Sequence, residues 1–153
     1  MPKVEKDYEE LLLLFNKHKV KYCVIGAFAV GFYAIPRYTK DIDILVEPTT
    51  CNGEKIVTAL KEFGFGPLKL SKGDFSRPGR FVQLGYEPVR VDIITSIKGC
   101  SFEKAWRNKR KGLFGKEKVF FIGMDELIKA KRSAGRKQDL ADLEILYRVK
   151  SVK

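Results

Sequence analysis

Residues 41–47 read DIDILVE, a segment in which two aspartates alternate with isoleucines. This alternation predicts a β-strand. Because successive side chains of a strand point to opposite faces, Asp41 and Asp43 share one face, and Ile42 and Ile44 share the other. Removing a carboxylate from water costs several kcal/mol unless a partner compensates. The strand therefore needs a source of positive charge beside its acidic face.

Hydrophobic periodicity and turn residues predict the elements around this segment. We expect helices at 8–19, 27–35, 53–63, 101–108, 124–135 and 137–149, and strands at 21–26, 41–47, 80–86, 89–97 and 118–123. The strands at 80–86 and 89–97 flank the turn-prone sequence GYEP, which predicts an antiparallel hairpin. This order of elements predicts an α/β (α+β) fold, with a mixed β-sheet and flanking helices.

The length of 153 residues suits one domain. We expect a single domain over 1–153, with a core at about 20–123 and C-terminal helices at about 124–149. Lys and Arg total 30 against 19 Asp and Glu, a net charge of +11. This excess favours polyanionic partners such as nucleoside triphosphates or nucleic acid. A basic surface that only aids solubility is the open alternative.

The cysteines Cys23, Cys51 and Cys100 are widely spaced and form no CxxC or Cys/His cluster. This pattern argues against a disulfide framework and a zinc site, and it suits a reduced cytoplasmic setting. Neither a cleavable leader nor the ~20 apolar residues of a membrane span is present in the sequence. We therefore expect a cytoplasmic protein that does not enter a membrane.

A third aspartate, Asp92, lies in the predicted strand VRVDII. If that strand lies beside Asp41 and Asp43, three carboxylates converge and repel one another, and cations are needed to offset the repulsion. Oxygen donors without His or Cys favour Mg²⁺. Two such ions about 3.5–4 Å apart serve phosphoryl and nucleotidyl transfer. The alternatives are a salt-bridged strand face for Asp41 and Asp43 and a structural role for Asp92.

Gly26 and Ala27 lie between a predicted strand and a predicted helix. A phosphate can approach the backbone N–H groups at such a helix start. The alternative is that the small residues serve close packing.

Together these motifs resemble the DNA polymerase β-like nucleotidyltransferase superfamily. Its signature is a hydrophobic residue and Gly-[Gly/Ser], a spacer, and then Asp-x-[Asp/Glu] on a strand. Here it reads Ile25-Gly26-Ala27, a spacer at 28–40, and Asp41-Ile42-Asp43. The superfamily's third carboxylate corresponds to Asp92. Ala27 departs from the pattern, because it stands where Gly or Ser is expected.

The C-terminal part is similar to minimal bacterial nucleotidyltransferases of the AbiEii toxin type. The similarity rests on Asp125 and Lys131 in DELIKAK and on RKQDLAD at 136–142, where Gln138 replaces the usual Lys. The segment that leads into Asp41 and Asp43, RYTKDID at 37–43, also resembles this group of proteins in sequence. Asp139 and Asp142 share a helical face and would orient the neighbouring bases.

The resemblance implies a Mg²⁺-dependent nucleotidyltransferase with two metal ions, for which Mn²⁺ is an alternative. It implies that Asp41, Asp43 and Asp92 are both catalytic and metal-binding. The residues that would bind the triphosphate are Gly26, Ala27, Arg37, Thr39, Lys131 and Arg136. For Lys131, Arg136 and Lys137 the alternative is a solvated basic helix end, and for Arg37 it is a salt bridge to an acid.

The basic run RNKRK at 107–111, beside Trp106, offers a further hypothesis. It could hold an RNA backbone, with the aromatic ring as a stacking platform. An exposed charge run beside a buried Trp is the alternative.

The expected reaction moves an NMP from an NTP to a hydroxyl on RNA, protein or a small molecule. The acceptor is unidentified; tRNA and a partner protein are candidates, and a homodimer is one way to hold it. Two other functions stay open: a non-catalytic toxin–antitoxin component on the same fold, and an RNA-binding module.

Overall fold

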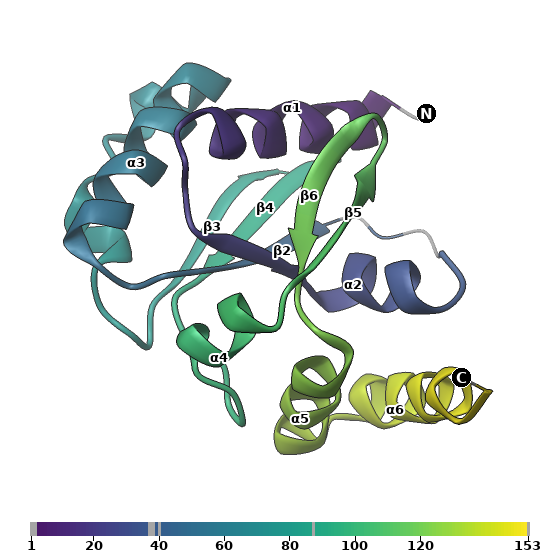
Figure 1. Ribbon diagram of the computed structural model, residues 1–153. Coiled ribbons are helices and arrows are strands. Elements are labelled where there is room, and N and C mark those ends of the chain that lie inside the picture. Colours follow the sequence, from purple (N-terminus) through teal and green to yellow (C-terminus); the bar gives the residue numbers. More distant parts are fainter. Residues whose placement is uncertain (1–2, 37–38, 40, 87, 153) are drawn as a thin grey trace.

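The structure, a computed structural model, describes residues 3–36, 39, 41–86 and 88–152 and has a six-stranded mixed sheet at its centre (Figure 1). The strands are β1 (Tyr22–Ile25), β2 (Asp41–Val46), β3 (Phe81–Tyr86), β4 (Val89–Ile94), β5 (Arg110–Phe114) and β6 (Glu117–Phe121), in the order β3-β4-β2-β1-β6-β5. The pairs β1–β2, β3–β4 and β5–β6 are antiparallel, whereas β2–β4 and β1–β6 are parallel.

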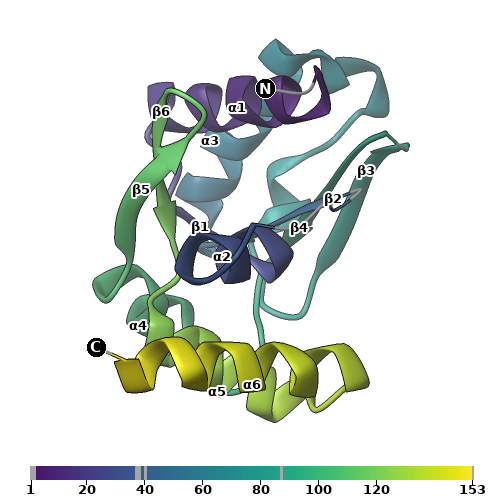
Figure 2. The same cartoon turned by 90° about the vertical axis from the view of Figure 1, so that its right-hand side faces the viewer.

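Helices lie on both sides of this sheet (Figures 1 and 2). They are α1 (Lys3–Lys17), α2 (Gly26–Tyr33), α3 (Thr50–Leu60), α4 (Phe102–Arg107), α5 (Met124–Ala134) and α6 (Lys137–Val152). Helices α1 and α3 cover one face, and α5 and α6 lie on the opposite side (Figure 2). No helix in the described ranges has both the length and the apolar character required to cross a membrane.

The alternation in β2 separates an apolar layer from an acidic one. Ile42 and Ile44 are fully buried, as are Val91 and Ile93, the residues opposite them on β4. Burying such side chains contributes roughly 1.5–3 kcal/mol each. This apolar layer fixes the two strands side by side and leaves their other face free for polar residues.

The predicted fold class is confirmed, and so are the β3–β4 hairpin and the end of α5 at Gly135. Helix α3 begins at Thr50 rather than Gly53, because the Thr49 side chain caps it by accepting a hydrogen bond from the Asn52 amide at 3.2 Å.

Strand β5 was not predicted. Its first residues belong to the basic run at 107–111, and the structure pairs them with β6 so that Lys111 lies opposite Phe120. Because β5 is an edge strand, its charged side chains reach solvent, and the apolar alternation that identifies a strand is weak there. Lys61–Phe65 continues the helix predicted at 53–63, whereas the short helical turns Gly66–Leu68 and Lys72–Phe75 were not predicted.

Asn52 links three elements away from the acids. Its side chain is 2% exposed, accepts from the Lys21 amide at 2.8 Å, and donates to the carbonyls of Lys21 and Glu47 at 3.0 Å each. These bonds tie the start of α3 to the start of β1 and the end of β2.

We expect Asn52→Ala to destabilise the fold by about 2–3 kcal/mol, because it leaves buried backbone groups without partners. Urea unfolding followed by circular dichroism measures the change. The control is Thr58→Ala on the same helix, which removes an exposed hydrogen bond to the Glu54 carbonyl and should cost no more than about 0.5 kcal/mol. Equal losses in the two variants would contradict this role for Asn52.

Candidate active site

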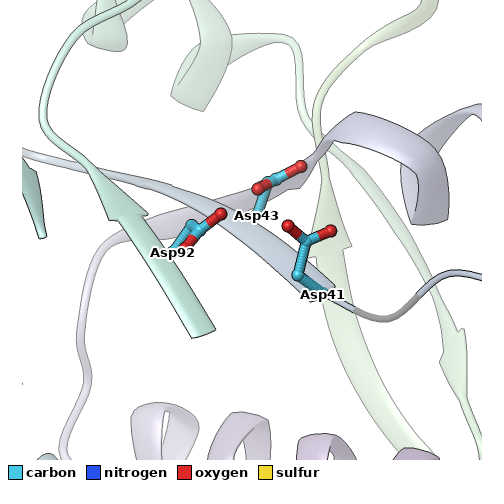
Figure 3. Close-up of side chains that lie close together, drawn as sticks. All are labelled: Asp41, Asp43 and Asp92. Carbon is cyan, nitrogen blue, oxygen red and sulfur yellow. The ribbon is translucent and has the colours of Figure 1, made fainter. Parts of the chain in front are cut away.

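Parallel pairing of β2 and β4 brings the three predicted acids together. Asp43 lies directly opposite Asp92 in the register of the pair. One carboxylate oxygen from each of Asp41, Asp43 and Asp92 lies within 4.8 Å of the others (Figure 3). The side chains project from the face opposite the buried isoleucines, so the sequence correctly placed all three in one cluster.

Gly26 lies against this cluster at the junction of β1 and α2. Its φ of +69° is in the left-handed region, which favours glycine, and its neighbour Ile25 pairs with Asp43 across the sheet. A Cβ at Gly26 would overlap Oδ2 of Asp43 and would lie only 3.1 Å from the Asp43 Cβ. Glycine is therefore required here both by backbone conformation and by the close approach of the carboxylate.

The cluster is electrostatically unfavourable for its own carboxylates. Burial, followed by the charges of Asp41 and Asp92, raises the pKa of Asp43 to about 7. Burial and the adjacent Asp92 also raise the pKa of Asp41, although Arg90 and Thr39 partly counter this effect. The site thus holds more negative charge than its surroundings stabilise, a property that favours binding of a cation.

Arg90 is a member of the cluster that the sequence analysis missed. Its guanidinium donates to Asp92 at 3.2 and 3.3 Å and lies 3.6 Å from an oxygen of Asp41. The signal was present in VRVDII, since residues two apart on a strand share a face and Arg90 precedes Asp92 by that spacing. Arg90 supplies part of the positive charge that the acids require.

Lys131 and Arg136 lie across the cavity from the acids and have carboxylate partners of their own. The Lys131 amine lies 3.2 Å from Asp139 and 3.0 Å from Asp142. Arg136 Nε donates to Asp139 at 2.7 Å. Burial opposes ionisation of Asp139, but the bonds from Arg136 and Lys131 outweigh it and lower its pKa. The expectation that Asp139 and Asp142 orient these bases matches the contacts.

A cavity of about 400 Å³ joins these groups. The three acids and Gly26 form one side of it, and Arg90, Lys98, Lys131 and Arg136 supply positive charge around it. Phe81, Ile94 and Ile97 give it an apolar side. The arrangement can accept a ligand that carries both anionic groups and a flat or apolar part.

Two predicted nucleotide-binding residues, Ala27 and Thr39, are not among the residues that line this cavity, although the Thr39 hydroxyl donates to Oδ1 of Asp41 at 3.3 Å. Ala27 lines a separate hollow with Phe28 and Leu113. Thr39 accepts from the Asp41 amide at 3.2 Å, so its hydroxyl helps to fix the start of β2. Arg37 lies outside the described residues. Gln138, in the place of the usual Lys, donates to Asp142 at 3.0 Å and joins the network that holds Lys131.

Comparisons with known proteins identify the fold. No protein-family model matches the chain, and no curated protein is similar to it in sequence. Several solved structures are similar to it in fold, among them the following three. The antibiotic-resistance factor ANT(2'')-Ia matches over 97% of this chain and 84% of its own, with a TM-score of 0.64 and 9% identity. An antigenic nucleotidyltransferase-like protein from Paracoccidioides brasiliensis matches over 94% of this chain and 75% of its own, with a TM-score of 0.61 and 12% identity. The lincosamide antibiotic adenylyltransferase LnuA, solved with lincomycin bound, matches over 94% of this chain and 96% of its own, with a TM-score of 0.58 and 16% identity.

At these identities the similarity concerns the fold. The chain therefore has the nucleotidyltransferase fold, which the sequence predicted. The narrower similarity to AbiEii-type proteins is not among these findings and stays a prediction.

We expect Asp43→Asn to stabilise the metal-free protein above neutral pH. A carboxyl group whose pKa is raised on folding loses its contribution to stability as pH rises. For Asp43 the loss occurs between its unfolded pKa of about 4 and its folded pKa of about 7. Replacing it should therefore raise the free energy of unfolding by about 1–3 kcal/mol at pH 8, with little change at pH 4. Urea unfolding in EDTA at both pH values measures the difference.

Asp125→Asn is the matched control, because Asp125 is exposed and pairs with Lys150. Losing this surface pair should cost at most about 1 kcal/mol at either pH. A variant of Asp43 that is destabilised at pH 8 would show that the acids do not repel one another as the geometry indicates.

Proposed function

We propose that this chain is a nucleotidyltransferase that moves an NMP from an NTP to a hydroxyl acceptor, within a single domain spanning 1–153. The observation that carries the proposal is the convergence of Asp41, Asp43 and Asp92 within 4.8 Å beside the start of α2. The fold shared with ANT(2'')-Ia and LnuA supports the same class of reaction.

The three acids fit a magnesium site. All are oxygen donors, neither His nor Cys is among the described residues that line the cavity, and the crowded carboxylates lack sufficient counter-charge. Asp41, Asp43 and Asp92 would hold the metal, proposed as two Mg²⁺ ions with Mn²⁺ as the alternative. When bound, such ions supply positive charge that activates the attacking hydroxyl and stabilises the leaving pyrophosphate.

The protein's own groups would bind and orient the triphosphate. The first backbone N–H groups of α2, including that of Ala27, have no partner within the helix and can donate to phosphate oxygens. The Ala27 amide can do so even though its methyl faces another hollow. Lys131 and Arg136 face the acids across the cavity and would neutralise phosphate charge. Asp139 and Asp142 would position Lys131 for this contact.

The acceptor would approach the carboxylates by the open side of the cavity, and RNA, protein and small molecules all remain candidates. Among proteins of this fold, LnuA has been solved with lincomycin and ANT(2'')-Ia with adenylyl-2''-tobramycin. In those two proteins the bound molecules are small antibiotics or their adenylyl derivatives. The resemblance to AbiEii-type proteins implies a toxin–antitoxin component and leaves both the toxin and the antitoxin role open.

In a transfer assay with Mg²⁺, α-³²P-labelled NTPs and pooled tRNA, protein and aminoglycoside acceptors, the wild-type protein should label one acceptor class. Asp41→Asn and Asp43→Asn should each lower the rate by about 10²–10³-fold, the range seen when one group that stabilises transition-state charge is removed. EDTA should abolish transfer, and Mn²⁺ should restore it.

Asp125→Asn again serves as the control, since Asp125 is exposed and does not line the cavity. It should transfer at the wild-type rate. Transfer that survives Asp43→Asn would refute the proposed site. If the wild-type protein transfers no label and calorimetry detects no metal-dependent NTP binding, the non-catalytic role on the same fold is the correct one.

A further inference from the structure

A second hollow, which we call the lysine cleft, lies where the end of α1 meets the β5–β6 hairpin and α4. Its volume is about 580 Å³. Lysines from four separate stretches of the chain line it: Lys19, Lys21, Lys55, Lys111 and Lys118. Trp106 and Phe120 line the same hollow. The fold therefore gathers ammonium groups that are far apart in the sequence.

Little negative charge offsets these lysines. The described residues that line the cleft include no Asp or Glu. Of nearby acids, Glu47 lies 3.5 Å from Lys21, and Glu117 accepts from Asn16 at 2.8 Å. Clustered like charges repel one another, so a surface of this kind attracts a ligand with several negative charges.

Trp106 holds one more cation beside the cleft. The Lys109 amine lies 3.8 Å from the centre of the indole ring and donates to the Trp106 carbonyl at 3.0 Å. Phe102 stacks on the same ring system, and Phe120 meets it edge-on. With the ring occupied by these neighbours, the cleft offers cations for phosphates rather than a free aromatic face for a base.

This arrangement changes the interpretation of the basic run at 107–111. Lys109 packs on Trp106, Arg110 lines a different hollow with Asp125, and Lys111 lines the cleft. The run is therefore divided among three places. The charged surface is formed by the fold and not by the run itself.

A third hollow adjoins both the lysine cleft and the acidic cavity, and Glu47 and Glu103 are among the residues that line it. It shares Lys21 and Trp106 with the lysine cleft and Ile97 with the acidic cavity. Lys21 precedes β1 and Gly26 follows it, so the two sites are separated by about 16 Å, at ~3.3 Å per residue of strand. A strand that keeps the helical rise of B-DNA, ~3.4 Å per nucleotide, spans this length in about five nucleotides.

We propose that the lysine cleft binds the phosphodiester backbone of a nucleic-acid strand and directs that strand to the acidic cavity as the acceptor. The acceptor role rests on the proposed nucleotidyl transfer, whereas backbone binding does not. The lysines contact phosphates, and the adjoining hollow leads a terminal hydroxyl towards Asp41, Asp43 and Asp92.

Binding is measured by fluorescence anisotropy with fluorescein-labelled single-stranded RNA and DNA of mixed sequence, without NTP or metal. Lys111→Glu/Lys118→Glu should weaken binding by at least tenfold near physiological salt. Each lost phosphate contact should also reduce the slope of log K against log salt by about 0.7, giving about 1.4 for the two. The RNA and DNA arms show which strand the cleft prefers.

The control is Lys6→Glu/Arg148→Glu, which changes net charge equally at exposed residues that do not line the cleft. It should bind within about twofold of wild type. Equal weakening in both variants, or no weakening in either, overturns the proposal. Preferential cleft-dependent binding of polyglutamate or of phosphatidylserine vesicles also overturns it, in favour of an acidic protein or a membrane surface.

The hypothesis of nucleic-acid binding at the lysine cleft can fail independently of the hypothesis of nucleotidyl transfer, because the binding measurement requires neither nucleotide nor metal. Cleft-dependent binding supports the lysine cleft even where no label is transferred. If the protein transfers label to an aminoglycoside but binds neither RNA nor DNA, the proposed nucleic-acid binding by the lysine cleft is wrong and the proposed nucleotidyl transfer stands.

Discussion

The candidate site depends on one in-register strand pair, β2 beside β4. Each strand has a fully buried apolar face, and this layer holds Asp43 opposite Asp92 despite their repulsion. Gly26 then approaches Asp43 so closely that a Cβ would overlap the carboxylate. Stability comes from one face of the pair and the capacity for chemistry from the other. The alternation of a single short segment, DIDI, creates this division.

The sequence predicted this division because it depends on local pattern. Alternation placed Asp41 and Asp43 on one face, and the turn at GYEP predicted the β3–β4 hairpin. The adjacency of β2 and β4 was conditional, because parallel strands are joined through a long connection that no local pattern records. Arg90 was missed although the same period-two rule applied to it, since a strand Arg usually indicates only a solvent-exposed position. Strand β5 was missed because an edge strand tolerates charged residues.

The excess of basic residues is distributed in two physically different ways. Around the acidic cavity, Arg90, Lys131 and Arg136 each contact a carboxylate within 3.2 Å. These cations position groups and balance local charge, so they leave little net potential to attract a distant ligand. In the lysine cleft several lysines line one hollow with few acids nearby, and their combined field extends roughly one Debye length, about 8–10 Å, into solvent. Long-range attraction of a polyanion therefore originates in the cleft and not in the site.

The choice of acceptor then follows from surfaces outside the carboxylates. The proposed chemistry uses the same acidic cluster for any hydroxyl acceptor, so the cluster itself would not discriminate between an antibiotic and a polymer. A cavity of about 400 Å³ suits a nucleotide and leaves little space for a large acceptor. A polymer would have to extend beyond that cavity, and the hollow lined by Ile97, Lys21 and Trp106 adjoins it. In the proposed transfer, the basic surface of the lysine cleft would therefore favour an acceptor that is long and anionic over one that is small and neutral.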